Sequence, residues 1–137
     1  MIIRNLVAHL SETSFTVYGV ADDSGDCVLT EWLSTLNGEL KACGDGLVAA
    51  LENMARRGPP KNEEVCHKIR GDIWQIRKGQ LRVLWFYDKG RVIVCTHGFI
   101  KKSRGTPKLQ IDAAFRTLEQ YHSAKAAGLL IIRGDND

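Results

Sequence analysis

The chain has 137 residues, of which 44% are hydrophobic and 26% are charged, and its formal net charge is +3. This length suits one domain with a real core and is too short for two full domains. The composition excludes a chain that is disordered over most of its length. No apolar run approaches the roughly 18–20 residues of a membrane-spanning helix, and the first residues lack the ordered regions of a secretory signal. We therefore expect a cytoplasmic protein that does not associate with a membrane.

Positive charge is concentrated in the middle of the sequence. Residues 56–108 hold 14 of the 19 Lys and Arg residues but only 4 of the 16 Asp and Glu residues. This segment therefore carries a net charge of +10, whereas the rest of the chain carries −7. Such a basic face suits a polyanionic partner. The alternative is a solvated surface whose charges pair with the acidic remainder.

The sequence begins with a segment that has little pattern, residues 1–14. Residues 15–20 alternate and are rich in β-forming side chains, so they predict a strand, and the polar residues 21–26 predict a loop. From Cys27 to Leu40 the apolar residues have helical spacing with one buried stripe.

A second helix is predicted directly after the first. Residues 42–46 contain two glycines and predict the break between the helices. Apolar residues at helical spacing predict the second helix over residues 47–55. The sequence Gly58-Pro59-Pro60 predicts its end, because glycine accepts the left-handed stop and proline cannot continue a helix.

Three strands joined by short turns are predicted next. The strand candidates are residues 72–77, 80–87 and 91–98, and glycine-containing turns separate them at residues 78–79 and 88–90. This spacing predicts a three-stranded antiparallel meander. The apolar runs within it are nearly continuous, which indicates a central sheet covered on at least part of both faces.

A third helix is predicted after the meander. Thr106 suits the N-cap and Pro107 suits the first turn, and an amphipathic pattern continues to about residue 125. The apolar residues that begin at Leu129 predict either an added strand or a partly ordered end.

The predicted order is β-α-α-β-β-β-α, which belongs to the α+β class with helices against a small sheet. We expect one domain over residues 15–125, an N-terminal extension over residues 1–14 and a C-terminal tail over residues 126–137.

The sequence carries no signature of a metal or cofactor site. None of the four cysteines forms a Cys-x-x-Cys pair, so we expect them to be small buried residues. No cluster of carboxylates or histidines has metal-ligand spacing, and the glycines match neither phosphate-binding fingerprint. We therefore expect no metal and no cofactor.

The meander and its exit bring together groups that suit a phosphodiester. Arg77 and Arg82 flank one tight turn, and arginine makes bidentate contacts with phosphate. His97 lies near the end of the third strand and titrates near neutral pH. Lys101 and Lys102 follow it and can offset charge that develops in a transition state.

Each of these residues also has a structural interpretation. Arg82 would be a salt-bridged or snorkelling arginine, and His97 a hydrogen-bonded structural histidine. The two lysines would belong to a solvated loop. Trp74 and Trp85 could be platforms for base stacking, but we expect them to be core residues.

Four short segments resemble a known family in both order and spacing. They are Ile73–Arg77 (IWQIR), Leu81–Phe86 (LRVLWF), Thr96–Lys102 (THGFIKK) and Thr106-Pro107. Together they resemble the phage-derived RelE-like toxins that include many HigB-type proteins, whose segments read LWELR, YRVLYF, LHGFxKK and TP. The resemblance covers residues 15–121. It implies the RelE/ParE fold, a small twisted antiparallel sheet with a helical hairpin and a C-terminal helix.

The resemblance also implies a function. Many such proteins are toxins of toxin–antitoxin pairs; RelE-type members cleave mRNA at the ribosome, whereas ParE-type members act on DNA gyrase. Arg82 matches the arginine of the catalytic groove, and Arg77, His97, Lys101 and Lys102 match their family counterparts.

Two residues depart from the family pattern. Gln75 stands where the family usually has Glu, and Leu81 where it usually has Tyr. A tyrosine that some RelE toxins carry before the last helix has no clear match.

The first hypothesis is a metal-independent endoribonuclease that inhibits translation. The five residues Arg77, Arg82, His97, Lys101 and Lys102 would then be catalytic. The residues expected to bind RNA are Lys68, Arg70, Lys78, Arg104 and Lys108. Its partners would be mRNA, the ribosome and an antitoxin of the helix-turn-helix type. The second hypothesis is a non-catalytic relative that inhibits a host target such as gyrase, and the third is a degenerate prophage remnant.

Overall fold

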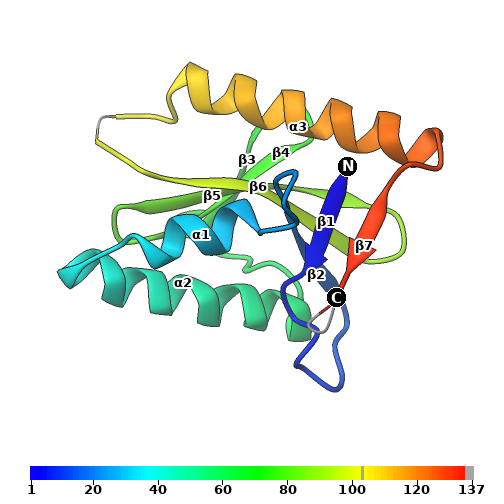
Figure 1. Cartoon of the computed structure of the whole chain (residues 1–137). Coiled ribbons are helices and arrows are strands. Elements are labelled where there is room, and N and C mark those ends of the chain that lie inside the picture. The colour runs from blue at the N-terminus through cyan, green and yellow to red at the C-terminus, as the bar shows by residue number, and fades with distance from the viewer. Residues whose placement is uncertain (103, 135–137) are drawn as a thin grey trace.

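The computed structural model describes residues 1–102 and 104–134. A seven-stranded sheet is covered by one helix on one face and by two helices on the other, as Figure 1 shows. The elements in chain order are β1 (Ile2–Asn5), β2 (Thr16–Val20), α1 (Val28–Ser34), α2 (Gly38–Arg57), β3 (Cys66–Arg70), β4 (Ile73–Lys78), β5 (Leu81–Asp88), β6 (Val92–Ile100), α3 (Lys108–Ala126) and β7 (Ile131–Arg133).

The α+β class predicted from the sequence is confirmed, but the sheet is larger than expected. Its strand order is β3-β4-β5-β6-β2-β1-β7. The predicted meander forms β4, β5 and β6, which pair in antiparallel fashion. The expectation of a purely antiparallel sheet is wrong, because β2 pairs with β6 and β1 pairs with β7 in parallel. The additional strands β1, β3 and β7 have only three to five residues each, too few for a clear period-two pattern.

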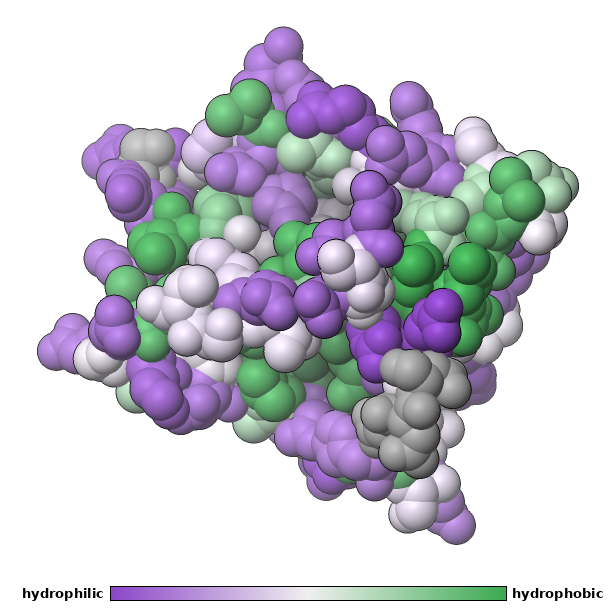
Figure 2. Space-filling view, viewed as in Figure 1, coloured by the Kyte–Doolittle hydropathy of each residue, from purple (hydrophilic) through white to green (hydrophobic). Residues whose placement is uncertain are grey.

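Both ends of the chain contribute to one edge of the sheet. Ile2–Asn5, within the segment for which the sequence predicts little pattern, form β1, and Ile131–Arg133 form β7 beside it. Of the two alternatives for the tail, the structure therefore has the added strand; residues 135–137 lie outside the described residues. Leu129, Ile131 and Ile132 are exposed there, and Figure 2 shows hydrophobic side chains gathered over β7 and the turn after α3.

The break between the first two helices lies earlier than predicted. It falls at residues 35–37, and α2 runs without interruption through Gly44 and Gly46. A Cβ atom on Gly44 would lie 3.2 Å from Leu36 Cδ1, so a small residue is needed where the two helices meet. The glycines therefore mark close packing rather than a helix end. The predicted end at Gly58 is confirmed, with φ +86° at this residue.

The start of α3 also differs from the sequence-based prediction in one detail. Pro107 is the N-cap residue of α3. The side chain of Thr106, which was expected to cap the helix, instead donates a hydrogen bond to Gln75 Oε1 at 2.7 Å.

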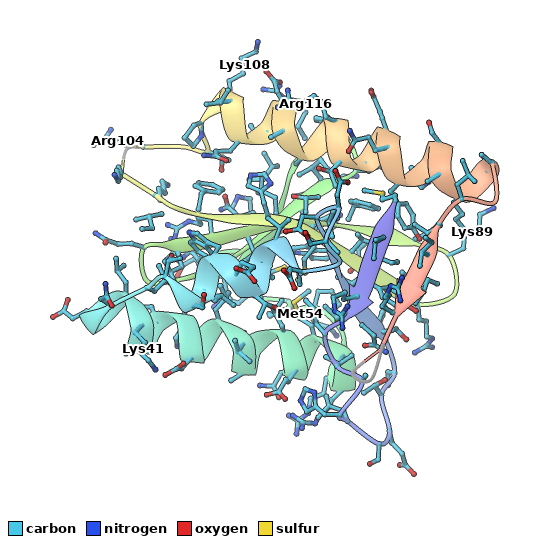
Figure 3. The ribbon with its side chains drawn as sticks, viewed as in Figure 1. Lys41, Met54, Lys89, Arg104, Lys108 and Arg116 are labelled. Carbon is cyan, nitrogen blue, oxygen red and sulfur yellow. The ribbon has the colours of Figure 1, made fainter. Side chains whose placement is uncertain are left out.

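Two apolar clusters pack on the two faces of the sheet. Trp85 and Met54 belong to the cluster under α1 and α2, whereas Leu84, Phe86 and Tyr121 belong to the cluster under α3. Figure 3 shows Met54 near the C-terminal end of α2, between that helix and the sheet. Both faces of β5 are covered, which accounts for its continuous apolar run. This confirms the expectation of a central sheet that is covered on at least part of both faces.

The four cysteines are free thiols. Cys27, Cys66 and Cys95 are buried and Cys43 is half-buried, as expected for small apolar residues. Within residues 1–102 and 104–134, no three His, Cys, Asp or Glu residues are grouped as metal ligands would be. No helix in the same part of the chain has the length and apolar character needed to cross a membrane.

Substitution of Gly98 should strain the contact between β6 and α1. A Cβ atom at this position would lie 2.3 Å from Trp32 Cζ3, so Gly98→Ala must displace the indole. Overpacking of this kind costs about 1–3 kcal/mol. We expect that loss in the free energy of unfolding measured by urea denaturation. Gly46→Ala is the control, because its Cβ would meet only the flexible side chain of Lys78 and alanine favours the helix. Equal stability of the two variants would contradict the described contact.

Asp88 links the end of β5 to α3 and should make stability depend on pH. Its carboxylate accepts hydrogen bonds from Tyr121 Oη at 2.5 Å and from Lys125 Nζ at 2.6 Å. Burial would raise the pKa of this carboxyl, but the hydrogen bonds from Lys125, Tyr121 and the Lys89 N–H together with the Lys125 charge lower it to about 2.

The unfolded carboxyl has a pKa near ~3.9, so the stabilisation is present above that pH and is lost as the pH falls toward 2. We expect the free energy of unfolding to drop by about 2 kcal/mol over this range. Asp88→Asn should remove this part of the pH dependence, measured by denaturation at several pH values. A parent and variant with parallel pH profiles would contradict the assignment.

Candidate functional site

Two arginines lie opposite each other where the β4–β5 hairpin turns. Lys78 pairs with Leu81, which leaves the two-residue turn Gly79-Gln80 and places Arg77 directly opposite Arg82. Gly79 has φ +58°, a backbone conformation that glycine adopts without strain. The short turn therefore brings two guanidinium groups to the same end of the sheet, on the face covered by α3.

Arg82 is only 5% exposed. Its Nη1 donates hydrogen bonds to the carbonyl oxygens of Gly79 at 2.7 Å and Leu81 at 2.9 Å, while Nε is buried without a partner. Burial, followed by the charge of Arg77, lowers the pKa of Arg82. Within residues 1–102 and 104–134 no carboxylate forms an ion pair with it. Its positive charge is therefore held by carbonyl dipoles and is not neutralised by an acidic side chain.

His97 and Gln75 flank Leu84 one row further along the same face. His97 Nε2 donates to Gln110 Oε1 at 2.8 Å, and its Nδ1 lies 3.0 Å from Thr96 Oγ1. Burial lowers the pKa of His97, against the effect of the Gln110 hydrogen bond. Both ring nitrogens are therefore engaged, and burial favours the neutral form of the ring.

The lysines follow β6 and reach the arginine end of the sheet. The backbone N–H of Lys101 donates to Gln80 O at 2.8 Å, which ties the exit of β6 to the turn between the arginines. Lys101 is half-buried, whereas Lys102 and Arg104 are exposed. Figure 3 shows Arg104 at the outer end of the loop between β6 and α3.

The other residues predicted to bind RNA do not form one surface. Lys68 pairs across strands with Trp74 and Arg70 pairs with Ile73, on the exposed edge strand β3. Lys78 lies across Gly46 of α2 on the opposite face from Arg82. Lys108 forms an ion pair with Asp112 at 3.6 Å and points outward from α3 in Figure 3.

The site also contains residues that the sequence did not identify. Gln110 and Thr106 hold His97 and Gln75 through their side chains, and so connect the start of α3 to the polar row of the sheet. The sequence pointed to Thr106 only as the N-cap of the third helix, not as a partner of Gln75. A glutamine in the first turns of an amphipathic helix carries no signal of such a contact.

The sequence matches the model of one protein family. The sequence model of the family described as "Phage derived protein Gp49-like (DUF891)" matches residues 31–119, which include α2, the meander and most of α3. The strands β1, β2 and β7 lie outside the matched range. No curated protein matches the chain.

Proposed function

Because the chain belongs to the family of phage-derived Gp49-like proteins, a family of RelE/ParE-type toxins, we propose that it cleaves mRNA as the toxin of a toxin–antitoxin pair. Membership of such a family suggests an antitoxin partner. We assign the activity to the proposed domain of residues 15–125, with mRNA on the ribosome as the substrate and a helix-turn-helix protein as the antitoxin.

The arginine pair at the end of the β4–β5 hairpin supports this proposal most strongly. Arg77 is exposed and Arg82 lies opposite it, beneath the surface. A buried cation without an ion-paired carboxylate creates a positive potential at the surface above it, because the protein interior screens charge poorly. Arg77 would contact the phosphate directly, Arg82 would stabilise its additional negative charge, and Lys101 and Lys102 would complete the cationic surface.

The reaction needs no metal in this scheme. The 2′-oxygen of the ribose attacks the adjacent phosphorus, a 2′,3′-cyclic phosphate forms and the bond from phosphorus to the 5′-oxygen breaks. The proton of the 2′-hydroxyl is transferred overall to the departing 5′-oxygen. Fixed cations that face the phosphate lower the barrier, because negative charge increases there in the transition state.

The geometry favours a positioning role for His97. Its two ring nitrogens are already engaged with Gln110 and Thr96, so it holds the start of α3 over the sheet. The proton-transfer role that its residue type suggests would require the Gln110 hydrogen bond to open.

Gln75 favours the second candidate, a non-catalytic inhibitor of a host protein such as DNA gyrase. An amide cannot accept a proton as the usual glutamate can, and Gln75 is held by Thr106 at 2.7 Å.

Controlled expression in bacteria separates the two functions. The first predicts growth arrest together with new 5′ ends within translated mRNA, mapped by primer extension. Growth arrest without new ends, accompanied by loss of DNA supercoiling by gyrase, would support the second. Unimpaired growth would contradict both.

A further inference from the structure

A second groove lies on the sheet face opposite the arginine pair, beyond the C-terminal end of α2. It has a volume of about 760 Å³, and its lining includes Pro59, Lys61, His67, Lys68, Trp74 and Tyr87. The segment that follows Gly58 forms one wall, and the edge strand β3 with its neighbours β4 and β5 forms the floor. The sequence favours a core position for Trp74 over a base-stacking role, and the proposed cleavage reaction does not use this groove.

Two aromatic side chains form a corner in the groove. The half-buried Trp74 stacks on the buried Trp85, with ring centroids 5.4 Å apart and an interplanar angle of 22°. Tyr87 is 41% exposed and stands at 81° to Trp74 with a centroid distance of 5.7 Å. Trp74 therefore has one face supported by the core while its ring also lines the groove. A supported indole beside a perpendicular ring suits a flat heteroaromatic ligand.

The rim of this corner is basic. Lys61 and Lys68 are exposed, and neither forms an ion pair with any other residue that the structure describes. Lys68 is the cross-strand neighbour of Trp74, so both side chains lie on the same face of the sheet. Glu63 is the one carboxylate in the lining, against two lysines and His67. The charge is therefore complementary to an anion that carries an aromatic ring.

The groove is suited to binding rather than to covalent chemistry. Its thiol, Cys66, is buried, and burial raises its pKa to about 11 despite the opposing effect of Trp85. The group therefore remains a thiol at neutral pH, and the thiolate is the nucleophilic form.

We propose that this groove binds single-stranded RNA, with one base stacked on Trp74 against Tyr87 and the neighbouring phosphates on Lys61 and Lys68. Stacking on aromatic side chains together with a cationic rim is the usual way in which proteins hold unpaired bases. The proposal concerns a binding site separate from the proposed cleavage site. It rests on the proposed function only in taking RNA as the anionic ligand. The basic edge strand β3, with Lys68 and Arg70 exposed, lies between this groove and the face that carries Arg77.

The binding can be measured without cleavage or ribosomes. The full chain is titrated into a fluorescent eight-nucleotide RNA, and binding is followed by anisotropy at low salt. Trp74→Leu should weaken binding about tenfold, which corresponds to the loss of one base stack, and Lys68→Gln should weaken it several-fold. Lys41→Gln is the matched control, because Lys41 is an exposed lysine on α2 outside the groove, and it should bind as the parent does.

Photocrosslinking with 5-bromouridine in the same RNA provides a readout that does not depend on a substitution. We expect crosslinked peptides that contain Trp74 or Tyr87. Crosslinks confined to other segments, or unchanged affinity in both Lys68→Gln and a folded Trp74→Leu, would overturn the proposal. The crosslinks to peptides that contain Trp74 or Tyr87 should persist in Arg82→Met, so a failure of the groove and a failure of the cleavage function give different results.

Discussion

Replacing Arg82 with methionine should reduce mRNA cleavage by about 100- to 1,000-fold, the usual effect of removing one group that stabilises transition-state charge. Methionine retains an apolar chain of similar length but removes the guanidinium that lies opposite Arg77. The carbonyl oxygens that lose their donor are part-buried at Gly79 and buried at Leu81, so some loss of stability accompanies the substitution. The effect on activity is measured separately, as new mRNA ends after controlled expression.

Arg116→Met is the matched control. Arg116 is exposed on α3, and Figure 3 shows it on the side of that helix away from the sheet. This variant should arrest growth as the parent does, and thermal unfolding should show that both variants are folded. A folded Arg82→Met variant that cleaves mRNA at the parent rate would remove the basis of the proposed mechanism.

The largest effect on stability should come from truncating Phe86. This residue of β5 is fully buried, and its ring lies 5.3 Å from that of Tyr121 on α3. Phe86→Ala leaves a cavity between the sheet and α3, and such changes cost about 3–5 kcal/mol. That is a large part of the ~5–15 kcal/mol that stabilises a typical domain. Urea denaturation should show a much lower midpoint.

Phe86→Leu separates the loss of volume from the loss of the aromatic ring. Leucine fills most of the space, so we expect less than half the loss caused by alanine. If the alanine variant unfolded at the parent midpoint, α3 could not pack on β5 as described.

The central part of the fold could be predicted because its patterns are long and local. The strands β4, β5 and β6 lie within one or two residues of the predicted ranges, and α3 occupies its predicted range. Gly58 and the two prolines after it identified the end of α2. Each of these segments has either a clear hydrophobic period or a strong signal for the end of a helix. Neither kind of signal depends on residues that are distant in sequence.

The strand β1 could not be predicted, and β7 was only one of two alternatives, because their pairing joins segments that are distant in sequence. β1 pairs with residues 131–133, and four residues beginning with Ile2 show no periodicity that would predict this. Gly44 and Gly46 were misleading for a similar reason. Gly44 packs against Leu36 and Gly46 lies under the flexible side chain of Lys78, and a sequence pattern cannot separate a tight contact from a helix break.

The candidate site could be predicted in part. The short hairpin turn fixes the pairing of Arg77 with Arg82, and that turn is visible as Lys78-Gly79. The burial of Arg82 and the engagement of His97 by Gln110 depend on how α3 lies over the sheet. Neither property is encoded in the spacing of the residues involved.

The parallel pairing of β1 with β7 has a consequence for biosynthesis. β1 is translated well before residues 131–133, which cover its outer edge in the described sheet. A nascent or prematurely terminated chain therefore exposes a ready template for intermolecular strand addition. The sheet can therefore be completed only after residue 133 has been translated.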